Sequence, residues 1–151
     1  MQFNHILVPI DFGEPSLRAL DAAISLAPKF GSTITLLHVS WLPPPVYAAY
    51  AQGFAWPTEE MERSAREELA SVLEKTRAEY DAVEGLVVTG EPRQMILDVA
   101  AERCVDLIVM GTHGRHGIPR AILGSVAERI VRQSVVPVLT VSAKPGHSGH
   151  A

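Results

Sequence analysis

The sequence predicts an α/β domain in which a parallel sheet carries helices on both faces. Two observations support this class. Short apolar runs alternate along the chain with segments of helical periodicity. Each pair of runs is separated by enough residues for a crossover helix, which neighbouring parallel strands require. The 151 residues, 47% of them hydrophobic, suit one domain with one core.

The first three elements follow directly from the residue pattern. Residues 3–10 are apolar and rich in β-forming residues, which predicts a strand that ends before Asp11. Residues 14–27 form a helix, since one helical face is apolar at Leu17, Leu20, Ile24 and Ala27. Gly31 stops this helix, and residues 32–39 form the second strand.

Residues 41–57 break the alternation and are predicted to form a long loop. Three consecutive prolines precede a set of aromatic residues, and Trp41 and Trp56 stand at its ends. The loop could act as a lid, form a surface for a partner, or pack over the core. Thr58 then begins a helix that reaches about Asp81 and has a charged outer face.

The rest of the chain continues the alternation. Its predicted elements are a strand at 85–89, a helix opened by Pro92, a strand at 105–110, a helix at 125–133 and a strand at 137–141. Residues 1–143 are therefore expected to be one domain, and the polar residues 144–151 a disordered tail.

Composition excludes several function classes. A net charge of −4 with scattered basic residues argues against nucleic-acid and anionic-membrane binding. No apolar run approaches the roughly 20 residues of a membrane span. The first residues lack the pattern of a signal peptide, so a cytoplasmic protein is expected. Cys104, the single cysteine, is predicted to be buried, and the histidines show no spacing typical of a metal site.

A glycine-rich segment follows the fourth strand and suggests a phosphate site. Gly111 and Gly114 are followed, after nine residues, by Gly124 and Ser125 at the head of a helix. Glycine lets main-chain N–H groups approach an anion, and a helix N-terminus presents unpaired N–H donors. Asp11 and Gly111 follow strands one and four, so they line one crevice if those strands are neighbours where the strand order reverses.

These motifs resemble the universal stress protein family from Ile6 to Val141. The resemblance lies in VPIDFGEPS at 8–16, LLHV at 36–39, GEPRQMI at 90–96 and the Gly111-x2-Gly114-x9-Gly124-Ser125 pattern, which resembles that of the family's ATP-binding branch. It implies a Rossmann-like or flavodoxin-like five-stranded sheet of order 3-2-1-4-5. It also implies a homodimer, and an ATP site at the ends of strands one and four.

The resemblance implies a set of nucleotide-binding residues. They are Pro9, Ile10, Asp11, Val39, Met110, Gly111, Thr112, His113, Gly114, Arg115, Gly124, Ser125 and Val126. Pro9 and Ile10 would line the adenine pocket, with main-chain contacts from Val39, and Asp11 would bind the ribose. The glycine loop would wrap the ribose and phosphates, and the N–H groups from Gly124 onward would bind the phosphate chain.

Each assignment has a local structural alternative. Ser125 and Glu128 match a capping box, in which Ser125 accepts a bond from the Glu128 N–H group and the Glu128 side chain returns to Ser125. Asp11 could cap the helix that starts near Glu14. His113 and Arg115 could neutralise phosphate charge or belong to a solvated loop.

The segment from Gly111 to Ser125 lacks the Gly-Lys-[Ser/Thr] of a Walker A loop, which argues against fast ATP hydrolysis. The sequence predicts no catalytic residues. Together with the resemblance, this implies a regulatory, stress-response protein that binds ATP, with Mg²⁺ held through the phosphates and at most slow hydrolysis or autophosphorylation. The alternatives are an AMP or cyclic-nucleotide binder, or a dimeric protein-interaction module whose nucleotide is structural.

The last strand gives a physical reason for dimerisation. It is apolar, and in a monomer it would be an exposed edge at Val136, Val138, Leu139 and Val141. The resemblance implies antiparallel pairing of two such strands across a two-fold axis. The sequence identifies neither the protein partner nor the signal that this protein serves.

Overall fold

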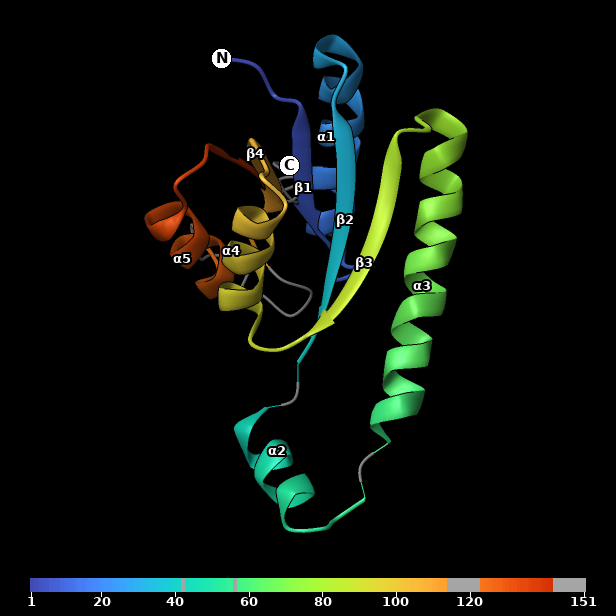
Figure 1. Ribbon diagram of the computed structural model, residues 1–151, viewed down its shortest axis with the longest axis vertical. Helices are drawn as coiled ribbons and strands as arrows, with labels where there is room; N and C mark the ends of the chain where they lie inside the picture. The colour runs from blue at the N-terminus through green and yellow to red at the C-terminus, as the bar shows by residue number, and fades with distance from the viewer. Residues whose placement is uncertain (42, 56, 114–122, 143–151) are drawn as a thin grey trace, which may run out of the picture.

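Five parallel strands form one sheet in the order β3-β2-β1-β4-β5 in the computed structural model, which describes residues 1–41, 43–55, 57–113 and 123–142 (Figure 1). The strands are β1 (His5–Pro9), β2 (Thr33–Ser40), β3 (Val83–Thr89), β4 (Leu107–Gly111) and β5 (Val138–Val141). The helices are α1 (Glu14–Phe30), α2 (Pro44–Ala51), α3 (Thr58–Glu79), α4 (Pro92–Glu102) and α5 (Ser125–Gln133). The predicted fold class and strand order are confirmed.

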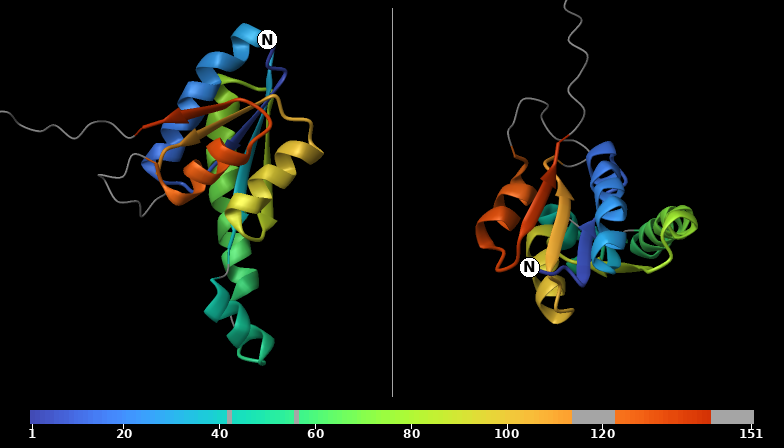
Figure 2. Two further views of the ribbon diagram at one scale, coloured as in Figure 1. Left: turned by 90° about the vertical axis from the view of Figure 1, so that its left-hand side faces the viewer. Right: turned by 90° about the horizontal axis from the view of Figure 1, so that it is seen from above.

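Helices cover both faces of the sheet, α1 and α3 on one face and α4 and α5 on the other (Figure 2). Successive residues of β1 point to opposite faces, so Ile6 and Val8 pack under α1 while Leu7 packs under α4 and α5. All three side chains are fully buried. Each such burial stabilises the fold by about 1.5–3 kcal/mol, which explains why strands covered on both faces are apolar throughout.

Helix α1 begins and ends close to its predicted bounds. Gly31 ends it in the left-handed conformation, with φ +65°, and donates its N–H to Ala27. The helix extends to Phe30 although Pro28 lies in its last turn. The prediction for Gly31 is confirmed.

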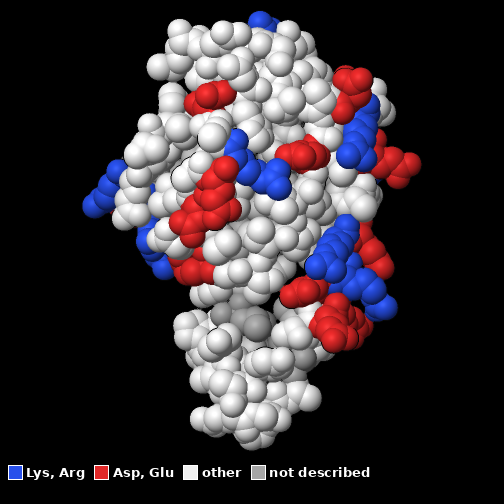
Figure 3. All heavy atoms as spheres, viewed as in Figure 1, with Lys and Arg blue, Asp and Glu red and all other residues white. Residues whose placement is uncertain are grey.

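The prediction of a long loop at 41–57 is wrong in part, because this segment contains α2. Pro43 is the N-cap of the helix, and Pro44 and Pro45 occupy its first turn, where a missing N–H breaks no helical hydrogen bond. No residue of α2 is buried, and the helix projects from the end of the sheet (Figure 1). The sequence from Trp41 to Pro57 has no charged residue, and the lobe around α2 is correspondingly uncoloured in Figure 3.

The prediction that Cys104 is buried is also wrong. Its side chain is exposed, and its backbone has φ +52°, in the left-handed region. Its N–H donates to the carbonyl of Ala101 in the turn that joins α4 to β4. The strand begins at Leu107 rather than at Val105, so Cys104 belongs to the turn and faces solvent.

No helix in the described ranges combines the length and apolar character needed to cross a bilayer. The predicted tail at 144–151 and most of the glycine loop fall outside the described residues.

Candidate functional site

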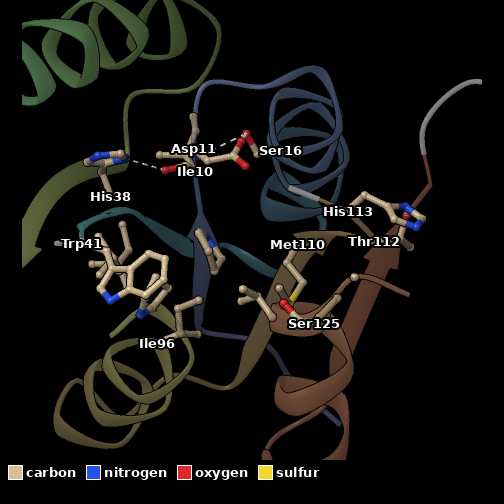
Figure 4. Close-up of a pocket in the computed structure, with 18 residues that line it drawn as sticks. Ile10, Asp11, Ser16, His38, Trp41, Ile96, Met110, Thr112, His113 and Ser125 are labelled. Carbon is tan, nitrogen blue, oxygen red and sulfur yellow. Dashed lines mark hydrogen bonds between the residues drawn. The ribbon is translucent and has the colours of Figure 1, made fainter. Parts of the chain in front are cut away.

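A cavity of about 550 Å³ opens at the carboxyl ends of β1, β2 and β4, beside the N-terminus of α5 (Figure 4). Strands β1 and β4 are direct neighbours, with Ile6 opposite Leu107 and Leu7 opposite Ile108. The strand order reverses between β1 and β4. This is the condition under which Asp11 and Gly111 were expected to line one crevice, and such a switch point is a common ligand site in α/β sheets. The volume of the cavity is in the range of small-molecule binding sites.

All the candidate residues that the structure describes lie in the wall of this cavity. They are Pro9, Ile10, Asp11, Val39, Met110, Gly111, Thr112, His113, Gly124, Ser125 and Val126. Gly114 and Arg115 lie outside the described residues. The cavity wall also includes residues that sequence reasoning missed, namely Ser16, Leu37, His38, Trp41, Pro92, Ile96 and Ala127.

One end of the cavity is apolar. The buried apolar side chains of the cavity wall include Ile10, Leu37, Ile96 and Met110, each no more than 5% exposed, and they belong to the two cores of the sheet. Of these, Met110 is drawn next to Ser125 in Figure 4, so the apolar surface continues toward α5. Trp41 stands beside Ile96 at this end in Figure 4. Because packing holds these side chains in place, the apolar surface is fixed before any ligand arrives.

Asp11 lies in a turn that ties the end of β1 to the start of α1. Its Oδ1 accepts hydrogen bonds from the Gly13 N–H at 2.9 Å and from the Ser16 hydroxyl at 2.8 Å. Gly13, rather than Asp11, is the N-cap of α1, and no side chain caps it directly. The simple capping interpretation of Asp11 is therefore wrong, since its carboxylate organises the turn before the helix.

The turn itself has an unusual backbone. Phe12 has φ +66°, which is rare for a residue with a bulky side chain. Its ring packs against the ring of His38, with the centroids 4.8 Å apart. This packing helps to hold a conformation that directs Asp11 to the cavity.

His38 joins the ends of β1 and β2. Its Nδ1 lies 2.9 Å from the carbonyl oxygen of Ile10, which can only accept, so Nδ1 carries the hydrogen. The Ile10 N–H in turn donates to the carbonyl of Leu37 at 2.8 Å. The two strand ends are thus held together where they form the cavity wall.

Gly111 is required for packing against α1. A Cβ built on it would lie 2.8 Å from the Cβ of Pro15 and 2.9 Å from the Pro15 carbonyl carbon, closer than real atoms approach. This close contact is a reason for glycine that is independent of any ligand.

The capping-box prediction for α5 is wrong. Gly124 is the N-cap and Ser125 the first helical residue, with no side-chain cap. The Glu128 N–H donates to the Gly124 carbonyl at 2.9 Å, and the Glu128 carboxylate instead pairs with Arg132 one turn further along.

The first turn of α5 consequently presents free donors to the cavity. The N–H groups of Ser125, Val126 and Ala127 have no acceptor inside the helix, and the described part of the chain gives them none. These residues all line the cavity. The helix dipole adds a partial positive charge at the same place.

His113 adds a polar group at this end. Its Nδ1 lies 3.0 Å from the Thr112 hydroxyl oxygen. Its Nε2 is buried and has no hydrogen-bond partner among the described residues. A buried polar atom of this kind is costly, and a ligand acceptor or donor would satisfy it.

Glu91 caps α4, whose residues Pro92 and Ile96 line the cavity. Its carboxylate accepts from the Arg93 Nε at 2.6 Å and from the Gln94 N–H at 3.0 Å, and it lies 3.8 Å from Arg129 of α5. Burial alone raises the pKa of Glu91, but the hydrogen bonds from Arg93 and Gln94 outweigh burial and lower it below the ordinary value of 4.5.

In the described residues, no three of the histidine, cysteine, aspartate and glutamate side chains gather closely enough to hold a metal ion. The cavity therefore offers a neutral apolar end, a carboxylate at Asp11, and a donor-rich end at α5. A ligand that combines an apolar ring with an anionic group fits this arrangement.

Comparison with known proteins gives consistent matches along the chain. The model of the universal stress protein family matches residues 2–142. Universal stress protein YxiE of Bacillus subtilis is 35% identical over 147 residues, covering 92% of this chain and 99% of YxiE.

Solved structures agree with the observed architecture. The structure of protein MJ0577 of Methanocaldococcus jannaschii has a TM-score of 0.78 and 28% identity, and the match covers 96% of this chain and 99% of that one. A universal stress protein of Archaeoglobus fulgidus in complex with dAMP has a TM-score of 0.66, with 93% and 99% coverage, and at 24% identity shows the shared fold alone.

Proposed function

Because this chain belongs to the universal stress protein family, we propose that it is a cytoplasmic regulatory protein that binds ATP in the cavity between β1, β4 and α5. The observation that carries the proposal is the division of one cavity into an apolar end and an end with free main-chain donors. This division matches the two ends of a nucleotide.

The phosphate end is formed by α5. The N–H groups of Ser125, Val126 and Ala127 would bind phosphate oxygens, together with the Ser125 hydroxyl. His113 Nε2, buried without a described partner, would gain one from the same ligand. The phosphate oxygens of ATP carry the negative charge that these hydrogen-bond donors would bind.

The base and ribose would occupy the other end of the cavity. Ile10 and Met110 supply buried apolar surface for a planar base, and Val39 supplies main-chain groups at the end of β2. Asp11 lies between the two ends, where its carboxylate would face the ribose. Gly114 and Arg115 belong to the proposed loop around the ribose and phosphates.

We do not propose that the protein hydrolyses ATP rapidly. The sequence has no Walker A lysine to hold the β and γ phosphates, and Asp11 already accepts two hydrogen bonds from its own turn. We expect at most slow hydrolysis or autophosphorylation, with Mg²⁺ bound through the phosphates.

We also propose a homodimer paired through β5. This strand is at one edge of the sheet, and Leu139 on it is 39% exposed. Antiparallel pairing with a second copy would cover the edge and satisfy its main-chain groups.

AMP or a cyclic nucleotide is the second candidate ligand. The described donors form one helix turn, which suits a single phosphate group as well as the end of a chain of three. One solved universal stress protein is in complex with cAMP and another with dAMP, each 24% identical to this chain.

A protein-interaction role with a structural nucleotide is a further candidate. It is favoured by α2, an uncharged helix with no buried residue, on which Tyr47 is 63% exposed. Partner binding that survives complete loss of nucleotide would support this role.

Calorimetry with a matched pair of variants tests nucleotide binding. Ser125→Asp places a negative charge at the first position of α5, where it suits the helix dipole but repels phosphate. Ser125→Asn has similar size without charge. ATP binding should be lost in the aspartate variant and largely kept in the asparagine variant, with both folded. Equal affinity in the two variants would contradict the proposed phosphate end.

The nucleotide that remains bound after purification gives an independent test. We expect mass spectrometry of the denatured protein to detect ATP or its hydrolysis product. AMP or a cyclic nucleotide alone would instead support the second candidate ligand.

A further inference from the structure

Trp41 stands where the chain leaves β2, and its side chain lines the apolar end of the cavity. The indole is 47% exposed. The described aromatic contacts join Phe3 to Phe30 and Phe12 to His38, so none of them covers the indole. Among the residues that the structure describes, this large aromatic ring therefore has no stacking partner, and it lies beside a ligand-sized cavity.

The surroundings of the indole suit a flat apolar ring. In Figure 4, Trp41 lies on one side of the cavity, and Met110 lies across from it. Ile96 and Met110 are 2% and 5% exposed, so these walls are fixed by the core. Apart from the imidazoles of His38 and His113, Trp41 is the one aromatic side chain among the described residues that line the cavity.

The donors at the opposite end determine which part of a ligand reaches Trp41. The first turn of α5 and His113 lie away from Trp41 in Figure 4, with Asp11 between the two ends. An anionic group bound at α5 therefore directs the rest of the ligand toward Trp41. For a nucleotide, that part is the base.

We infer that Trp41 is a base-stacking residue that makes the site prefer purine over pyrimidine nucleotides. This inference rests on the proposed nucleotide function. A purine covers more of an indole face than a pyrimidine does, and stacking depends on the covered area rather than on hydrogen bonds to the base edge.

Calorimetry on variants of the full chain measures the contribution of the indole. Trp41→Leu removes the aromatic face and should weaken ATP binding by roughly 5- to 100-fold, the range expected for one stacked base. Trp41→Phe retains a ring and should lose less. Tyr47→Leu is the matched control, because Tyr47 is 63% exposed on α2 and does not line the cavity. Its affinity should remain within about twofold of wild type.

The preference for purines is measured with CTP. Wild type should bind ATP more tightly than CTP, and Trp41→Leu should reduce that ratio. An unchanged ratio would overturn the assignment of specificity to the indole.

Fluorescence gives a readout at the indole itself. The chain contains two tryptophans, so Trp56→Phe leaves Trp41 as the reporter. ATP should quench its emission along a saturable curve whose Kd agrees with calorimetry, and inorganic tripolyphosphate should not quench it. Thermal unfolding of each variant checks that it is folded.

The results separate this inference from the proposed function. If wild type binds ATP and Trp41→Leu binds it equally well, the stacking role is wrong and the nucleotide site stands. If wild type binds no nucleotide, the proposed function fails, and the stacking role fails with it.

Discussion

The imidazole of His38, on β2, donates from Nδ1 to the carbonyl oxygen of Ile10, at the end of β1, across 2.9 Å. This bond joins two strand ends that are both part of the cavity wall. It fixes the separation of β1 and β2 at the place where we propose that the base binds. The ring of Phe12 packs on the same imidazole, so the turn that carries Asp11 depends on it as well.

His38→Ala should therefore weaken both the fold and the site. Loss of the hydrogen bond and ring contact is expected to lower the free energy of unfolding by about 1–2 kcal/mol. ATP affinity should fall because the strand ends separate more easily. Chemical denaturation and calorimetry measure the two effects, and unchanged values for both would show that the bond does not organise the site.

Gly111→Ala should destabilise the protein by about 1–3 kcal/mol, because the new Cβ meets Pro15 on the α1 side. Gly85→Ala is the control, since its Cβ would meet only the flexible side chains of Leu69 and Leu73, at 3.2 Å or more. Urea unfolding of both variants checks the difference. Equal stability of the two alanine variants would contradict the close contact between β4 and α1.

Glu91→Gln should reduce stability in a pH-dependent way. The pKa of Glu91 is lowered in the folded protein, so its stabilising contribution is present above the unfolded pKa and is lost as pH falls through the folded pKa. The side chain is 34% exposed, so solvent screening limits the effect near neutral pH to about 0.5–1 kcal/mol. The free energies of unfolding of wild type and variant should differ at pH 7, and the difference should shrink as the pH falls through the folded pKa of Glu91. If the difference in the free energy of unfolding stays constant as the pH falls, the charge of Glu91 does not stabilise the N-terminus of α4.

Leu139→Lys should prevent the proposed dimer, because it puts a charge on the exposed edge strand β5. Val131→Lys is the control, since Val131 is also exposed, at 46%, but lies on α5. Sedimentation should find a dimer for wild type and for the control, and a monomer for Leu139→Lys. A dimeric Leu139→Lys variant would place the interface elsewhere.

The sheet could be predicted from sequence because its central strands are buried on both faces. Ile6, Leu7 and Val8 are successive apolar residues, and this pattern has few other uses in a domain of this size. The apolar pattern did not decide which strands are neighbours; the order that places β1 beside β4 was implied by the family resemblance, and this order brings Asp11 and Gly111 to one cavity. The nucleotide roles of these residues stay predictions.

Other features depended on contacts that no local pattern encodes. Trp41 and Ile96 reach the cavity because α4 begins beside the end of β2, where the Gly90 N–H donates to the Ser40 carbonyl. Trp41 belongs to no recognised motif, and the GEPRQMI motif that ends at Ile96 does not itself indicate that Ile96 lines a cavity. Ser125 fits a capping box by spacing, but the helix begins one residue earlier than that motif needs, which frees the N–H groups of its first turn. Cys104 is exposed because a left-handed turn, rather than a strand, contains it.

Main-chain amide resonances of α5, followed by NMR during an ATP titration, test the central claim most directly. We predict saturable shifts of the Ser125, Val126 and Ala127 amides with one common Kd, and no comparable shift on the far face of α3, for example at Glu74. Saturable ATP binding that leaves those three amides unchanged would contradict a phosphate site at the N-terminus of α5, and the absence of any shift would contradict ATP binding itself.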